Sequence, residues 1–104
     1  MVWDEIDGVD IGHNVKLCPF TRLDQCSGNQ RPAGVLIYHL HADGSVCGGA
    51  VHYDVPVNAW EKRHERPLWT VVSWEPLTLS PSIQDPTCSE GFHGHIVDGY
   101  WIPC

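Results

Sequence analysis

Residues 34–55 read GVLIYHLHADGSVCGGAVHYDV and have the clearest strand pattern in the chain. Its first part, residues 34–40, is short and rich in β-branched and aromatic residues, which predicts a strand. The Asp43-Gly44 pair favours a hairpin turn, and residues 46–55 predict the returning strand. The Gly48-Gly49 pair interrupts this second strand, which indicates either a bulge or a close approach of two backbones.

Further strands are predicted in the second half of the chain. Residues 68–74 and 77–80 have strand character and are separated by Glu75-Pro76. Residues 94–102 predict a final hairpin that turns at Asp98-Gly99.

One helix is expected, at about residues 58–66. Asn58 can cap its first turn, Glu61 follows three residues later as in a capping box, and Pro67 lies just past its end. Because this helix has only about two turns, strands dominate the fold. The predicted fold class is therefore mainly β: a small antiparallel sheet or an open barrel of hairpins, with one short helix, stapled by a metal.

The 104 residues predict one domain. Residues 33–104 would form a zinc-binding β domain, and residues 1–32 an irregular segment packed on it, with one short strand around residues 15–17. The formal net charge of −7 counts against nucleic-acid binding, because phosphate contacts need clustered Lys and Arg. No apolar run is long enough to span a bilayer and no signal peptide is evident, so we expect a cytoplasmic protein.

Five cysteines and seven histidines in so short a chain indicate a metal site. An odd number of cysteines without a secretion signal is poor evidence for disulfides, whereas zinc prefers thiolate and imidazole ligands. Two Cys-x4-His pairs, Cys47 with His52 and Cys88 with His93, would provide a Cys2His2 set. Residues five apart in a regular strand point to opposite faces, so the first pair requires a bulge at Gly48-Gly49. The alternative is that both cysteines are small buried hydrophobic residues in a protein without metal.

The chain also resembles a family of small uncharacterised phage and bacterial proteins, over about residues 33–102. The matching pieces are CGGAVH (47–52), WTVVSWEPLTLSPSI (69–83), Cys88 and HGHIVDG (93–99). The resemblance implies a zinc site whose ligands are Cys47, His52, Cys88 and His93. Members of this family often carry the label "ammonia monooxygenase", but that chemistry belongs to a large membrane-bound enzyme, and this chain lacks the length and the membrane segments for it.

The family's cysteine knuckle has two cysteines, whereas this chain has only Cys47. The missing ligand could come from any one of Cys26, His39, His41 or His95, and His95 is the alternate ligand of this interpretation. His39 and His41 would share one face of a strand, as would His93 and His95.

Four candidate ligands favour a structural zinc site, because a catalytic zinc keeps one coordination position open. The predicted function is a zinc-stabilised β domain that binds or regulates a protein partner. The resemblance implies that it is phage-encoded and acts in the host cytoplasm. Its acidic charge favours a partner with a basic surface. The alternative is a small zinc-dependent hydrolase of peptide or amide bonds, with Glu90 as the general base beside a metal-bound water.

Overall fold

The computed structural model describes residues 2–23, 28–53, 68–85, 88 and 91–104. Within these residues the fold is mainly β, with antiparallel pairing between neighbouring strands and open sheets rather than a closed barrel. The predicted fold class is thus confirmed, while the helix expected at about 58–66 lies outside the described residues. The elements are η1 (Trp3–Glu5), β1 (Val9–Asp10), β2 (Val15–Leu23), β3 (Gln30–Leu40), β4 (Val46–His52), β5 (Thr70–Trp74), β6 (Leu77–Ser80), β7 (Ile83–Gln84), β8 (His93–Val97) and β9 (Tyr100–Pro103).

The main sheet has the strand order β1-β2-β3-β4. The predicted hairpin forms its second half, as β3 and β4, and its turn is closed by the His41 backbone N–H, which donates to the Ser45 carbonyl over 2.8 Å. Gly44 has a φ of 88°, a conformation that glycine adopts without steric cost. The Asp43-Gly44 turn is therefore confirmed.

The N-terminal segment differs from the expectation of an irregular region. It contributes β1 and β2, and β2 extends from Val15 to Leu23 instead of ending near residue 17. The alternation of buried Val15 and Leu17 starts the strand, and pairing with β3 continues to Leu23 opposite Gln30. Pairing with a long neighbouring strand thus overrides the turn character of the local sequence.

β4 is regular at the glycine pair, so the bulge considered from the sequence does not form. The β3–β4 register runs without a shift from Leu40 opposite Val46 to Gly34 opposite His52. Gly48 lies opposite Tyr38, and a Cβ at Gly48 would come within 3.0 Å of the Tyr38 ring. The nearest neighbour of Gly48 is thus the side chain of Tyr38, not a second backbone as expected from the sequence, and the missing side chain leaves room for the Tyr38 ring.

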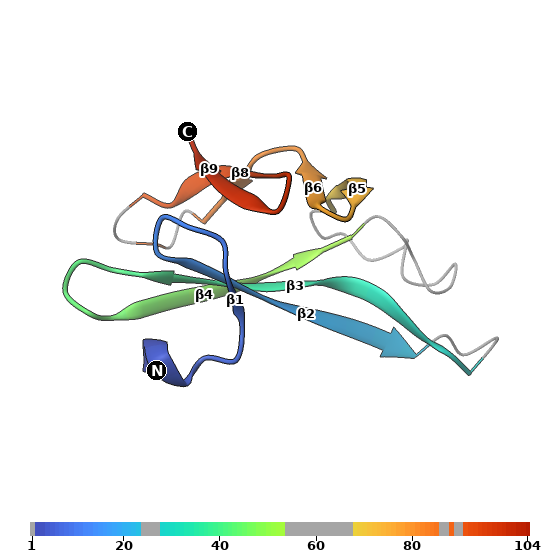
Figure 1. Cartoon of the computed structure of the whole chain (residues 1–104), viewed down its shortest axis with the longest axis horizontal. Coiled ribbons are helices and arrows are strands. Elements are labelled where there is room, and N and C mark those ends of the chain that lie inside the picture. The colour runs from blue at the N-terminus through green and yellow to red at the C-terminus, as the bar shows by residue number, and fades with distance from the viewer. Residues whose placement is uncertain (1, 24–27, 54–67, 86–87, 89–90) are drawn as a thin grey trace.

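A second layer lies over one face of the main sheet (Figure 1). It consists of the β5–β6 hairpin and the three-stranded sheet β7-β8-β9, with β6 beside β8. The predicted final hairpin is confirmed, and its turn residues Asp98 and Gly99 have φ values of 51° and 80°, as in a type I′ turn. The described part of the chain holds no helix long and apolar enough to cross a membrane.

The two layers share one hydrophobic core. Trp101 ties them further, because its backbone N–H donates to the Ile11 carbonyl over 2.9 Å. The buried residues of the core are Ile11, Val15, Leu17, Val35, Ile37, Val51, Tyr53, Leu79, Ile83, Cys88, Phe92, Ile96 and Trp101.

Candidate metal site

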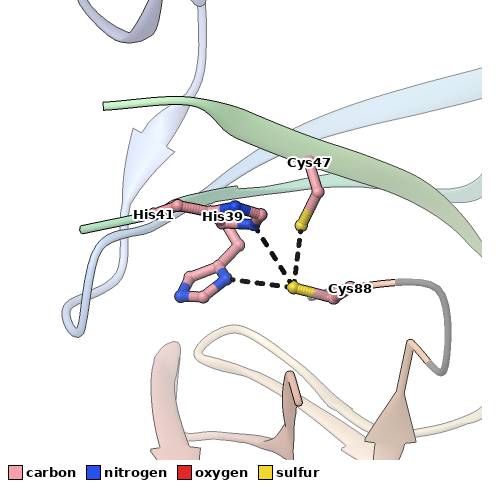
Figure 2. Close-up of side chains that lie close together, drawn as sticks. All are labelled: His39, His41, Cys47 and Cys88. Carbon is pink, nitrogen blue, oxygen red and sulfur yellow. Dashed lines mark hydrogen bonds between the residues drawn. The ribbon is translucent and has the colours of Figure 1, made fainter. Parts of the chain in front are cut away.

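Four side chains gather where the end of the β3–β4 hairpin meets the second layer (Figure 2): His39, His41, Cys47 and Cys88. One nitrogen or sulfur atom of each lies within 4.8 Å of the corresponding atoms of the other three. The two sulfur atoms are 3.3 Å apart. Cys88 Sγ is 3.6 Å from His39 Nδ1 and 3.3 Å from His41 Nε2. This cluster could hold a metal ion.

The β3–β4 ladder positions three of the four side chains. His39 lies opposite Cys47 in the antiparallel register, so the two project from the same face of the sheet. His41 follows His39 by two residues and continues the same row. Further back along β3 that row consists of the buried residues Val35 and Ile37, so the cluster lies at the end of the apolar face.

Cys88 comes from the second layer, in the connection between β7 and β8. Its backbone N–H donates to the Asp85 carbonyl over 3.2 Å, and its own carbonyl accepts from Gly91 over 3.0 Å. The Cys88 residue is buried, with 6% of its surface exposed. A metal bound to the cluster would therefore link the main sheet to the second layer.

The distances suit a tetrahedral ion. Zinc bonds of about 2.3 Å to sulfur and about 2.0–2.1 Å to nitrogen place neighbouring ligand atoms about 3.4–3.8 Å apart. The separations of Cys88 Sγ from Cys47 Sγ, His39 Nδ1 and His41 Nε2 are 3.3, 3.6 and 3.3 Å. The three distances from Cys88 Sγ are thus close to those of a tetrahedral site, and the remaining ligand atoms lie within 4.8 Å of one another.

The electrostatics of the cluster change with a cation. Burial, and then the hydrogen bond with Cys88, raise the pKa of the Cys47 thiol to about 12. In the metal-free protein Cys47 is therefore an uncharged thiol at neutral pH. A divalent cation would favour the thiolate, because its positive charge offsets the cost of burying a negative one.

Ser45 and Asp43 form a chain of hydrogen bonds to the Nδ1 side of the His41 ring. Ser45 Oγ lies 3.1 Å from His41 Nδ1 and donates to Asp43 Oδ1 over 2.6 Å. With the Ser45 hydrogen committed to the carboxylate, its oxygen can accept a hydrogen from His41 Nδ1. This fixes the tautomer that leaves His41 Nε2 free to coordinate a metal, as second-layer partners do in many metal sites. Asp43 Oδ1 accepts hydrogen bonds from both the Ser45 hydroxyl and the Ser45 backbone N–H. These two bonds, the hydroxyl first, lower the pKa of the Asp43 carboxyl, so it stays ionised.

Aromatic packing supports His39. Its ring stacks on Phe92 with the ring centres 4.7 Å apart, and Phe92 stacks on Trp101 at 4.4 Å. Phe92 and Trp101 are both buried. The stack holds the His39 imidazole against the second layer beside Cys88.

The structure brings together two of the four ligands predicted from the sequence, Cys47 and Cys88. Because β4 is regular, His52 lies on the opposite face from Cys47. There its ring meets Phe20 edge-on at 5.5 Å, and its Nδ1 lies 3.5 Å from Arg22 Nη2. The described residues thus place His52 outside the cluster.

His93 also lies outside the cluster, with its Nε2 3.0 Å from Ser82 Oγ. The alternate ligand His95 is part of β8 and is likewise not among the gathered side chains. Glu90, the candidate general base, and Cys26 lie outside the described residues. His39 and His41, considered from the sequence only as replacements for one missing ligand, supply both imidazoles.

No protein-family model, curated protein or solved structure matches the chain.

Proposed function

We propose that this protein is a zinc-stabilised β domain that acts as a binding or regulatory module on a protein partner. One observation carries the proposal: two sulfur and two imidazole donors, from both layers of the fold, lie within 4.8 Å of one another. Two thiolates and two imidazoles are a common ligand set of structural Zn2+. The core is small, so a metal that joins its layers would add substantially to its stability.

A structural role for the metal is favoured over a catalytic one. Four protein donors complete a tetrahedral shell, whereas a catalytic zinc keeps one position for water or substrate. The cluster lies between the layers, with Cys88 buried and the other three side chains half-buried. Such a metal would stabilise the fold, and the proposed protein binding would take place on the surface of the molecule.

A partner with a basic surface fits the surface of the molecule. The net charge of −7 attracts a positively charged protein. β9 turns Trp101 into the core and leaves Tyr100 and Ile102 on the outward side, 65% and 47% exposed. Exposed aromatic and aliphatic residues of this kind suit a protein contact. In line with the family resemblance, we expect a phage-encoded protein that meets its partner in the host cytoplasm.

The metal is tested by elemental analysis of protein purified without added metal, which should contain one zinc per chain. His39→Ala and His41→Ala should each lose the zinc. His52→Ala and His93→Ala are matched controls and should retain it. If zinc were lost in His52→Ala and His93→Ala but kept in His39→Ala and His41→Ala, the ligands would be those predicted from the sequence. A wild-type protein without metal would contradict the proposal.

The binding role is tested with a lysine-rich peptide and a glutamate-rich peptide of equal length. The zinc-loaded protein should bind the first, less tightly as salt is added, and Tyr100→Ala should weaken this binding. Equal binding of both peptides, or of neither, would contradict a basic partner. Hydrolysis of peptide or amide substrates that needs zinc and is abolished in zinc-loaded Glu90→Ala would replace the proposal with the hydrolase alternative.

A further inference from the structure

We infer that Cys47 and Cys88 form an oxidative modification site, at which a peroxide joins the two sulfurs of the metal-free protein in a disulfide. The inference concerns the same cluster as the proposed function, and it rests on that function for one consequence only, the competition between zinc and the disulfide. Formation of the disulfide does not require zinc binding and depends only on how close the Cys47 and Cys88 sulfurs lie.

The two sulfurs are in contact although the two cysteines are 41 positions apart in the chain. Their distance of 3.3 Å has to shorten by only about 1.2 Å to reach the disulfide bond length of about 2.05 Å. Both are free thiols in the structure. The fold thus holds the two reactants together before any oxidant arrives, which raises their effective concentration.

The other described cysteines lie elsewhere. Cys18 follows the buried Leu17 on β2, so it projects from the opposite face of the main sheet. Cys104 is exposed at the end of the chain, beyond β9. Among the described residues, oxidation should therefore select the Cys47–Cys88 pair.

The reaction balances with hydrogen peroxide as the oxidant. One thiol gives up its proton, its sulfur attacks a peroxide oxygen and the O–O bond breaks; the leaving hydroxide takes up that proton, so a sulfenic acid and one water form. The second thiol sulfur attacks the sulfenic sulfur, the S–O bond breaks, and a second water leaves. Two thiols lose two electrons and two protons, and one peroxide is reduced to two waters.

The disulfide and the metal exclude each other, because both need the same two sulfurs. The disulfide removes two of the four candidate ligands and leaves His39 and His41 alone. It also joins β4 to the connection before β8, so the layers stay linked after the metal has gone. Oxidation of the metal-free protein would thus replace the metal link between the layers by a covalent one and prevent zinc from binding again.

The test uses the full chain, treated with hydrogen peroxide after removal of metal with a chelator and, in parallel, with zinc bound. Mass spectrometry of unreduced peptides should find Cys47 joined to Cys88 in the metal-free protein. With free zinc at ten times its dissociation constant, the reaction should be about tenfold slower. The oxidised protein should bind less than a tenth as much zinc, and a thiol reductant should restore binding. Cys88→Ser should abolish the cross-link and Cys18→Ser should retain it.

A triple variant in which Cys18, Cys26 and Cys104 are serine keeps the reacting pair and provides a second check. A cross-link in this variant supports the inference. Sulfinic acid at Cys47 or Cys88 without the cross-link, or pairing of either with another cysteine, would overturn it. A cross-link in a protein that never binds zinc would contradict the proposed function but not this inference. Zinc binding without the cross-link would contradict this inference but not the proposed function.

Discussion

His39 lies opposite Cys47 in the antiparallel pairing of β3 with β4. Because paired residues share one face of a sheet, an imidazole and a thiol project side by side from a ladder that backbone hydrogen bonds hold together. Cys88, by contrast, belongs to the second layer. A metal would therefore join a half-site already formed by the hairpin to the other layer, and its removal should weaken the association of the layers more than the hairpin.

Removal of the metal should lower the stability of the protein. At free zinc about 1,000-fold above the dissociation constant, binding to the folded state adds about 4 kcal/mol to the free energy of unfolding. Chemical unfolding with and without a chelator measures this difference. His39→Ala is the control, and its unfolding should not respond to zinc. A wild-type unfolding curve that is the same in both conditions would contradict the metal's role.

Ser45→Ala should lower the zinc affinity by about tenfold, because the loss of a partner that orients a ligand histidine has effects of this size. Ser45 Oγ lies between His41 Nδ1 and Asp43 Oδ1, so its removal frees the imidazole to rotate. Competition with a chromophoric chelator measures the affinity. Ser80→Ala, at an exposed position of β6, should leave it unchanged. Equal affinity of wild type and Ser45→Ala would show that Ser45 does not orient His41.

Zinc affinity should rise with pH. Burial, with the Cys88 hydrogen bond, raises the pKa of Cys47 to about 12 in the metal-free protein, so at neutral pH zinc has to displace the Cys47 proton. Each proton released makes the apparent affinity rise about tenfold per pH unit. Chelator competition at a series of pH values, corrected for the chelator's own protons, gives the slope. An affinity that does not change with pH would exclude Cys47 as a ligand.

Much of the β3–β4 hairpin can be predicted from the sequence. The ligand set, however, depends on whether β4 bulges at Gly48-Gly49, and the sequence leaves this open. The β-branched run and the Asp43-Gly44 pair specify β3, β4 and their turn by local preferences. Gly48-Gly49 is compatible with a bulge or with a regular strand, and the two conformations place His52 on different faces. The structure has the regular strand, paired with β3 without a register shift.

The row that leads to His39 and His41 is evident from the burial along β3, not from the sequence, in which Leu36, Tyr38 and Leu40 are apolar as well. Val35 and Ile37 alternate with more exposed residues along β3, and extending this period by two and four residues reaches the two histidines. The position of Cys88 against this row depends on how the second layer packs, which spacing along the chain does not encode. The length of β2 is likewise set by its pairing with β3.

Gly34→Ala should destabilise the protein by about 1–3 kcal/mol, as overpacking in a core does. A Cβ at Gly34 would collide with the Val51 carbonyl oxygen and would come within 2.5 Å of the Phe20 ring. Gly49→Ala is the matched control in the same hairpin, since a Cβ there meets nothing within 4 Å. Denaturant unfolding of both variants checks the contrast. Similar losses at the two positions would contradict the packing of Phe20 over Gly34.

Tyr53 should weaken the fold at high pH. Burial raises the pKa of its hydroxyl above the ordinary value of about 10, so the unfolded chain ionises first. The stability that Tyr53 contributes is complete below about pH 10, and it falls by at most about 1.4 kcal/mol per pH unit as the pH rises toward the folded pKa. Unfolding at several alkaline pH values should show a shallower loss for Tyr53→Phe than for wild type. Tyr100→Phe, at an exposed position, is the control and should lose stability as steeply as wild type. Equal slopes in all three proteins would show that folding does not raise the pKa of Tyr53.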